Sequence, residues 1–218
     1  MDIKVDQNTV VVFDLDDTLY NELDYLKSAF KDITQRLSPG NWKSLYAYMF
    51  SLHRSKKNVF EIISENHQIE IPTLIDWYRS HQPEIHLFDG VFELLTQIKQ
   101  KGGKLAVVTD GRVKTQMAKL ESLGILQFFD EVVISEALGT EKPHLTNFRV
   151  LTEKMHGNQY FYIADNFKKD FITPNSLGWT TLGLIDNGLN IHYNHHEFFD
   201  EEHLPQYYIL SIKELRIV

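Results

Sequence analysis

The strongest constraint on the fold of this chain of 218 residues comes from short apolar runs that alternate with helical patterns. Five such runs are rich in β-branched and aromatic residues: VVVFDL at 10–15, LAVVT at 105–109, EVVIS at 131–135, YFYIA at 160–164 and WTTLGLI at 179–185. Near-continuous apolarity is typical of strands that are buried on both faces. Helical patterns ending on glycine lie between the later runs, at 90–103, 113–124 and 145–157. The alternation predicts an α/β fold, a Rossmann-like doubly wound parallel sheet with helices on both faces. The tail, 207–218, is expected to form a final edge strand followed by a short helix.

The segment 21–88 interrupts this alternation, because four helical patterns follow one another there without a strand-like run, at 24–37, 42–53, 59–67 and 72–82. An insertion directly after the first strand would lie at the carboxyl ends of the strands, where open α/β sheets bind ligands. We therefore expect an α/β core domain formed by 1–20 and 89–218, and an inserted helical cap domain formed by 21–88.

The composition narrows the class of partner. The net charge is −8, which argues against a nucleic-acid-binding surface. The absence of cysteine excludes disulfides, thiol catalysis and thiolate metal sites. Because no apolar run reaches membrane-spanning length and the first residues show no signal-peptide pattern, we expect a cytoplasmic protein. The composition leaves a monomer and a homodimer equally open.

Polar groups gather where the predicted strands end. The first strand runs into D-L-D-D-T-L at 14–19, although strands avoid aspartate and crowded carboxylates raise one another's pKa. T-D-G follows at 109–111, E-K-P at 141–143 and A-D-N-F-K-K-D at 164–170. Taken singly, each has an ordinary structural interpretation: the aspartates as turn formers or helix caps, and Lys142 as a solvated surface residue.

Together, the order acid, hydroxyl, cation, acid at one edge of a parallel sheet suits phosphoryl transfer with magnesium. Mg²⁺ prefers hard oxygen ligands, and carboxylates at Asp14 and Asp165 would supply two of them. A carboxylate can also attack phosphorus and give an aspartyl-phosphate intermediate. A hydroxyl, backbone N–H groups and a lysine then neutralise the transferring oxygens.

In this order, D-L-D-D-T-L, T-D-G, K-P and A-D-N-x-x-x-D resemble the four motifs of the haloacid dehalogenase (HAD) superfamily. The insertion is similar to the C1-type cap of the branch that contains phosphoglycolate phosphatase and β-phosphoglucomutase. The resemblance implies the strand order 5-4-1-2-3. It also implies a Mg²⁺-dependent phosphatase that hydrolyses a small phosphorylated metabolite, such as a sugar phosphate or a nucleoside monophosphate, through an aspartyl-phosphate. A sugar-phosphate phosphomutase and a non-enzymatic binding protein on the same fold are the alternatives.

The resemblance also assigns roles. It makes Asp14 the nucleophile and a metal ligand, and Asp16 the general acid and base, whose backbone carbonyl also binds the metal. Asp165 is implied as a direct metal ligand, and Asp170 as support for the water shell of the metal. The phosphoryl group would be held by Thr109, Asp110 and Lys142, and Gly111 and Arg112 are further candidates for contact with phosphate or substrate. Dehalogenases of the superfamily lack a carboxylate two residues after the nucleophile, so Asp16 argues for phosphate-ester chemistry. Relatives usually carry glycine at the position of Ala164.

Three further groups of residues have two interpretations each. The cap residues Arg54, Lys56 and Lys57 form either a solvated loop or a cationic lip for an anionic substrate. Aromatic side chains of the cap stack on a sugar or base or pack its core: Trp42, Tyr46, Tyr48 and Trp77. Histidines near the C-terminus suggest zinc, but Asp200 stands where a zincin helix needs histidine, so a polar surface loop is expected for His192, His195, His196 and His203.

Overall fold

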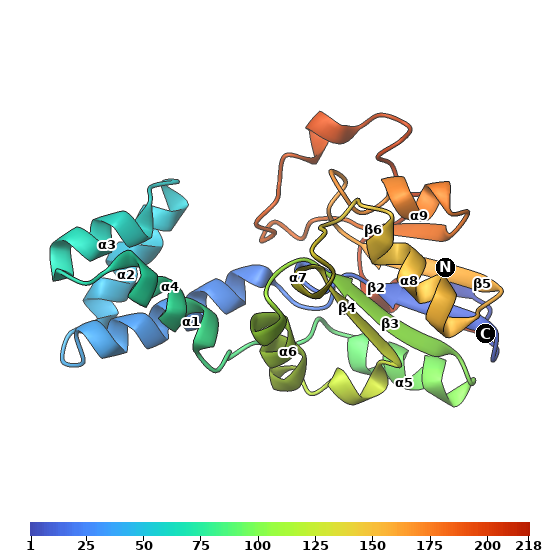
Figure 1. The fold of residues 1–218 in the computed structure, drawn as a ribbon, viewed down its shortest axis with the longest axis horizontal. Coiled ribbons are helices and arrows are strands. Elements are labelled where there is room, and N and C mark those ends of the chain that lie inside the picture. Colours follow the sequence, from blue (N-terminus) through green and yellow to red (C-terminus); the bar gives the residue numbers. More distant parts are fainter. The chain divides into compact units, whose positions relative to one another are not determined.

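The computed structural model describes residues 1–218, which form two compact units (Figure 1). One unit comprises Met1–Glu22 and His86–Val218, and the other comprises Leu23–Ile85. No helix of either unit combines the length and the apolar character that crossing a bilayer requires.

The first unit is built on a six-stranded sheet in which all neighbouring strands are parallel. The order is β4-β3-β2-β5-β6-β7, so the five predicted strands follow the order 5-4-1-2-3 and one further strand lies at the edge. The strands are β2 (Thr9–Phe13), β3 (Lys104–Thr109), β4 (Glu131–Ile134), β5 (Gln159–Ala164), β6 (Thr180–Leu184) and β7 (Tyr207–Ile209). The predicted α/β fold with a doubly wound parallel sheet is confirmed.

Helices cover both faces of this sheet (Figure 1). On one face, Phe148 and Leu151 of α8 belong to the same buried cluster as Val10 and Val12 of β2. Side chains alternate along a strand, so Val11, which is also fully buried, faces the other side, where Figure 1 shows α5 and α6. The helices of this unit are α5 (Val91–Gln100), α6 (Val113–Ser122), α7 (Ser135–Leu138), α8 (Thr146–Met155) and α9 (Ile172–Ser176), with 3-10 turns η1 (Leu126–Phe128), η2 (His195–Phe198) and η3 (Ile212–Glu214).

The two ends of the chain pair with each other. Strand β1 (Asp2–Ile3) forms a two-stranded parallel sheet with β8 (Arg216–Ile217). The predicted edge strand of the tail is β7, and the predicted short helix is the 3-10 turn η3. Strand β8 could not be predicted from the sequence, because a two-residue strand carries no periodicity of its own.

The second unit consists of helices only: most of α1 (Glu22–Leu37), α2 (Trp42–Arg54), α3 (Val59–His67) and α4 (Ile71–Ser80). Its core contains Phe30, Ile33, Met49 and Leu74, and Tyr46 and Trp77 pack against this core. The side chains of Arg54, Lys56 and Lys57 are exposed.

The two points where this insertion leaves and rejoins the first unit are tied together. Tyr20, just before the insertion, pairs with Leu87, just after it, and the Phe88 N–H donates to the Leu19 carbonyl at 2.8 Å. The chain thus leaves and rejoins the first unit at paired positions that follow β2 in the sequence.

Candidate active site

Three of the predicted site residues stand at the carboxyl ends of adjacent central strands. Asp14 directly follows β2, Thr109 ends β3 and Asp165 directly follows β5. The strand register places the ends of these three strands side by side, because Phe13 pairs with both Val107 and Ile163. The Asp14 N–H extends this ladder by donating to the Ile163 carbonyl at 2.9 Å.

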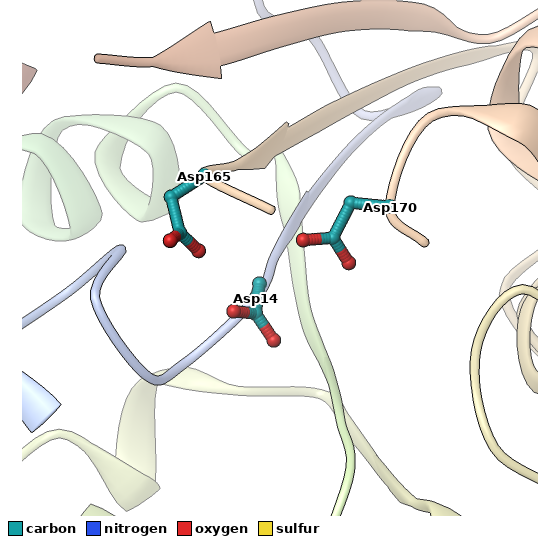
Figure 2. Close-up of side chains that lie close together, drawn as sticks. All are labelled: Asp14, Asp165 and Asp170. Atoms are coloured by element: carbon teal, nitrogen blue, oxygen red, sulfur yellow. The ribbon is translucent and has the colours of Figure 1, made fainter. Parts of the chain in front are cut away.

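The side chains of Asp14, Asp165 and Asp170 lie close together (Figure 2). All three residues are buried, and one oxygen from each lies within 4.8 Å of the others. Lys142 places its ammonium between two of them, with Nζ 2.6 Å from Asp14 Oδ1 and 2.6 Å from Asp170 Oδ1. The hydroxyl of Tyr162 donates to Asp170 Oδ1 at 3.0 Å and closes the network.

The carboxylates of this cluster are hard to ionise without a further cation. Burial, partly opposed by the charge of Lys142, raises the pKa of Asp14 to about 7. Burial, and then the charge of Asp14, raises the pKa of Asp165 well above its ordinary value. Lys142 itself stays charged despite its burial, because Asp14 and Asp170 hold its pKa well above its usual range.

Asp165 receives only neutral donors. Thr18 Oγ1 lies 3.3 Å from Asp165 Oδ1, and Asn190 Nδ2 donates to Asp165 Oδ2 at 2.9 Å. Asn190 belongs to the loop after β6, which also donates the Ile191 N–H to Asp17 Oδ2 at 2.8 Å. The other oxygen of Asp17 accepts the Glu22 N–H at 2.7 Å. Asp17 therefore fixes this loop and the start of α1 beside the site.

Asp16 points away from the three-carboxylate cluster and toward α6. Its Oδ1 accepts from Lys119 Nζ at 2.6 Å and from the Tyr20 hydroxyl, and its Oδ2 accepts from Gln116 Nε2 at 2.9 Å. Burial alone would raise the pKa of Asp16, but the Lys119 ammonium and these hydrogen bonds together lower it. The predicted general acid and base is a carboxylate held by three donors.

The three residues of the T-D-G segment have different contacts: Thr109 lies in the site, and Asp110 and Gly111 bind neighbouring segments of the chain. Thr109 Oγ1 accepts from Gln116 Nε2 at 2.5 Å. The Asp110 carboxylate accepts the Lys142 N–H at 3.0 Å and Lys169 Nζ at 2.6 Å, so it braces the loop that carries Lys142. The Gly111 N–H donates to Ser135 Oγ at 2.9 Å.

Arg112 is the one predicted contact that the structure does not bring to the other site residues. Its guanidinium pairs with Glu136, and 59% of its side chain is exposed. In this arrangement Arg112 lies on the outer surface at the start of α6.

A cavity of about 100 Å³ opens above these groups, lined by Asp14, Asp16, Asp17, Glu22, Thr109, Asp110, Asp165, Asn166, Lys169 and His192. Burial and the charge of Asp16 raise the pKa of Glu22 to about 8, so this carboxyl is protonated at neutral pH. Burial and the charge of Lys169 lower the pKa of His192. The cavity is large enough for a phosphoryl group but not for a whole drug-sized ligand.

The donor set fits a hard divalent cation. Buried carboxylates with few positive neighbours gain most from a bound ion, and Mg²⁺ takes oxygen ligands from carboxylates, carbonyls and water. Asp165 forms no ion pair, whereas Asp170 pairs with Lys142 through Oδ1 at 2.6 Å and accepts the Asn166 N–H through Oδ2 at 3.0 Å. This difference agrees with a supporting position for Asp170.

Several side chains that contact the site carry no signal in the sequence analysis. Gln116 and Lys119 lie inside α6, where polar residues usually face solvent. Asn190 and His192 come from the loop after β6. A polar surface loop is predicted for His192, but the structure places this residue in the lining of the cavity. Among the other histidines of that segment, His195 stacks on Phe167 and His203 pairs with Asp200.

Known proteins show which family this chain belongs to. Residues 11–183 match the family described as haloacid dehalogenase-like hydrolase, and the chain belongs to this family. It is 27% identical to the glyceraldehyde 3-phosphate phosphatase of Methanocaldococcus jannaschii, over 94% of each chain. It is 25% identical to the pyrophosphatase PpaX of Bacillus pumilus, over 80% of this chain and 82% of the relative.

Among solved structures, a predicted phosphoglycolate phosphatase from Haemophilus somnus 129PT superposes with a TM-score of 0.63 at 22% identity, covering 95% of this chain and 96% of that chain. This likeness shows the fold, and the family match confirms the predicted resemblance to the haloacid dehalogenase superfamily. The family and its named relatives make this protein a phosphohydrolase.

Proposed function

We propose that this protein is a Mg²⁺-dependent phosphatase that hydrolyses a small phosphorylated metabolite through an aspartyl-phosphate intermediate on Asp14. The observation that carries the proposal is the buried contact of Lys142 with Asp14, beside the carboxylates of Asp165 and Asp170. A cation on one oxygen of a buried carboxylate leaves the other oxygen as the nucleophile, which here is Asp14 Oδ2.

The proposed reaction has two steps. In the first, Asp14 Oδ2 forms a bond to phosphorus and the bond from phosphorus to the leaving oxygen breaks. Asp16, in the protonated form that the negative charge of a bound phosphoryl group would favour, gives its proton to that oxygen. In the second, Asp16 takes a proton from water, whose oxygen attacks phosphorus and releases the Asp14 carboxylate and inorganic phosphate. Thr109 and Lys142 would hold the phosphoryl oxygens throughout.

Asp14, Asp165 and the backbone carbonyl of Asp16 would hold Mg²⁺, with Asp170 behind them. Bound Mg²⁺ would offset negative charge on the carboxylates and on the phosphoryl oxygens. The high pKa values of Asp14 and Asp165 in the protein alone support this assignment, because such groups are stabilised as carboxylates only by a nearby cation.

We propose a sugar phosphate or a nucleoside monophosphate as substrate, and 21–88 as a cap that covers it. A relative named for a triose phosphate supports a small phosphorylated metabolite, and the cavity of about 100 Å³ suits the phosphoryl group alone. The inserted segment follows directly after β2 and its motif in the chain, which supports a role as a cap.

The test is phosphate release from a panel of phosphometabolites, with Mg²⁺ and with EDTA. The panel includes glyceraldehyde 3-phosphate, pyrophosphate, hexose phosphates and nucleoside monophosphates. Asp14→Asn keeps the shape of the side chain but removes the attacking charge, so it should abolish both release and trapping of a phosphoenzyme. Undiminished turnover by Asp14→Asn would show that another group is the nucleophile. Turnover that requires an activating sugar bisphosphate would identify a phosphomutase, and no turnover of any compound would favour a binding protein.

A further inference from the structure

The side chain of Gln116 connects two groups that the reaction needs. Its Nε2 lies 2.9 Å from Asp16 Oδ2 and 2.5 Å from Thr109 Oγ1, and Gln116 is 1% exposed. A primary amide nitrogen carries two hydrogens, so one Nε2 can donate to both acceptors. The reversed amide would direct a carbonyl oxygen at the Asp16 carboxylate, an acceptor facing an acceptor, so the observed orientation is the favourable one.

Lys119 completes the arrangement from the same helix. Gln116 and Lys119 are three residues apart on α6 and therefore share one face of it. The ammonium of Lys119 is 2.6 Å from Asp16 Oδ1, and its side chain is 4% exposed. Two buried polar side chains on one helix thus converge on a single carboxylate.

The backbone of Asp16 does not fix its carboxylate in the way that a strand would. Asp16 lies beyond the end of β2, and the next residue, Asp17, has φ of 55°, so the chain turns away from the sheet there. The position of the carboxylate is set by its donors, and two of the three come from α6.

We propose that Gln116 and Lys119 are positioning residues for the phosphatase reaction, which orient the Asp16 carboxylate and the Thr109 hydroxyl toward the same phosphoryl group. The inference rests on the proposed function, in which Asp16 is the general acid and base.

The lone pairs that remain on the Asp16 carboxylate identify the oxygen that transfers the proton. Oδ1 of Asp16 accepts from Lys119 and Tyr20 and is fully used, while Oδ2 accepts from Gln116 and keeps one lone pair. The proton that passes to the leaving oxygen is therefore carried by Oδ2. In the same way, Thr109 Oγ1 accepts from Gln116, so its own O–H is left to donate into the cavity that Thr109 lines.

Gly111 makes room for this arrangement. It has φ of +132°, and a Cβ there would lie 3.3 Å from both Cγ and Cδ of Gln116. The glycine of the T-D-G motif thus lets the Gln116 side chain lie against the loop and reach Asp16.

The test compares two substrates that differ in the need for an acid. 4-Nitrophenyl phosphate has a leaving group that departs without a proton, whereas 2-phenylethyl phosphate releases an alkoxide that needs one. In Gln116→Met, which keeps length and removes both donors, kcat/KM for the alkyl ester should fall about tenfold or more beyond the fall for the aryl ester. The inhibition constant of inorganic phosphate should rise about threefold to tenfold, because the Thr109 hydroxyl is no longer oriented.

Matched controls separate positioning from folding. Lys119→Met should show the same preference for the aryl ester, while Lys114→Met and Gln127→Met, at exposed positions, should behave as wild type. In the Asp16→Asn background, adding Gln116→Met should bring no further loss specific to the alkyl ester.

Equal losses on both esters in Gln116→Met and Lys119→Met would overturn the inference and leave a structural role. Two variants that retain the wild-type ratio of kcat/KM values would overturn it as well. Failure of the proposed function looks different, because wild type itself would then hydrolyse neither ester.

Discussion

Lys142 offers the sharpest test of the charge arrangement in this protein. Its side chain is 1% exposed, and its ammonium lies 2.6 Å from oxygens of both Asp14 and Asp170. In Lys142→Met, the length is kept but the buried carboxylates lose their cation. Removing one partner of a buried ion pair destabilises a protein by about 3–5 kcal/mol. For a chain of this size, 1 kcal/mol corresponds to about 2–4 °C, so we expect Tm to fall by about 6–20 °C at neutral pH without metal.

The loss should depend on pH in a defined direction. Burial raises the pKa of Asp14 to about 7 from an ordinary value of 3.8, so the folded state binds this proton more tightly than the unfolded state does. The stability of such a protein falls as pH rises from about 4 through 7. Removing Lys142 raises the pKa further and deepens this fall. The Tm difference between Lys142→Met and wild type should therefore be larger at pH 7.5 than at pH 5.

The assay is thermal unfolding of both proteins in EDTA at the two pH values. Lys154→Met is the matched control, because Lys154 pairs with Glu131 on the surface with 54% of its side chain exposed. Exposed pairs contribute at most about 1 kcal/mol, so its Tm should shift little. A Tm of Lys142→Met equal to that of wild type at pH 7.5, or a larger difference at pH 5, would refute the reasoning.

The remaining predictions concern the metal, the acid and base, and the inserted unit. Calorimetry on Asp165→Ala should show weakened Mg²⁺ binding, and an affinity equal to that of wild type would remove this residue from the metal site. Asp16→Asn should keep Mg²⁺ affinity, because its proposed ligand is a backbone carbonyl, yet lose about 10²–10⁴-fold in turnover of a substrate that needs the acid. Replacing Arg54, Lys56 and Lys57 together by Ala should raise KM for an anionic metabolite and leave kcat/KM for a small aryl phosphate unchanged. Equal losses on both substrates would show that these exposed residues support folding instead.

The central part of the site could be predicted from the sequence because its geometry follows from strand register. Asp14 and Asp165 each come directly after a buried apolar run, and parallel strands end at one edge of the sheet. Position along the chain therefore determined position in space. Lys142 was found through its motif, and the structure gives it two buried carboxylate partners.

The partners of Asp16 could not be predicted in this way. Gln116 lies 100 residues from Asp16 in sequence, and Lys119 lies 103 residues away. Nothing in the pattern of α6 distinguishes a buried lysine that meets a carboxylate from a lysine in water, because both occupy polar positions of an amphipathic helix. The same holds for Asn190, whose loop follows a strand without any periodic signal.

The lysines of the site are unevenly distributed among its carboxylates, and none of them pairs with Asp165. Lys142 pairs with both Asp14 and Asp170, and Lys119 and Lys169 each pair with one other carboxylate of the site. Asp165 forms no ion pair and receives only the Thr18 hydroxyl and the Asn190 amide. A carboxylate that is fully buried and bonded only to neutral donors is stable in its charged form only if an outside cation joins it. Among the three clustered carboxylates, Asp165 is therefore the one that the protein leaves without a positive partner, and a bound metal ion would contribute most there.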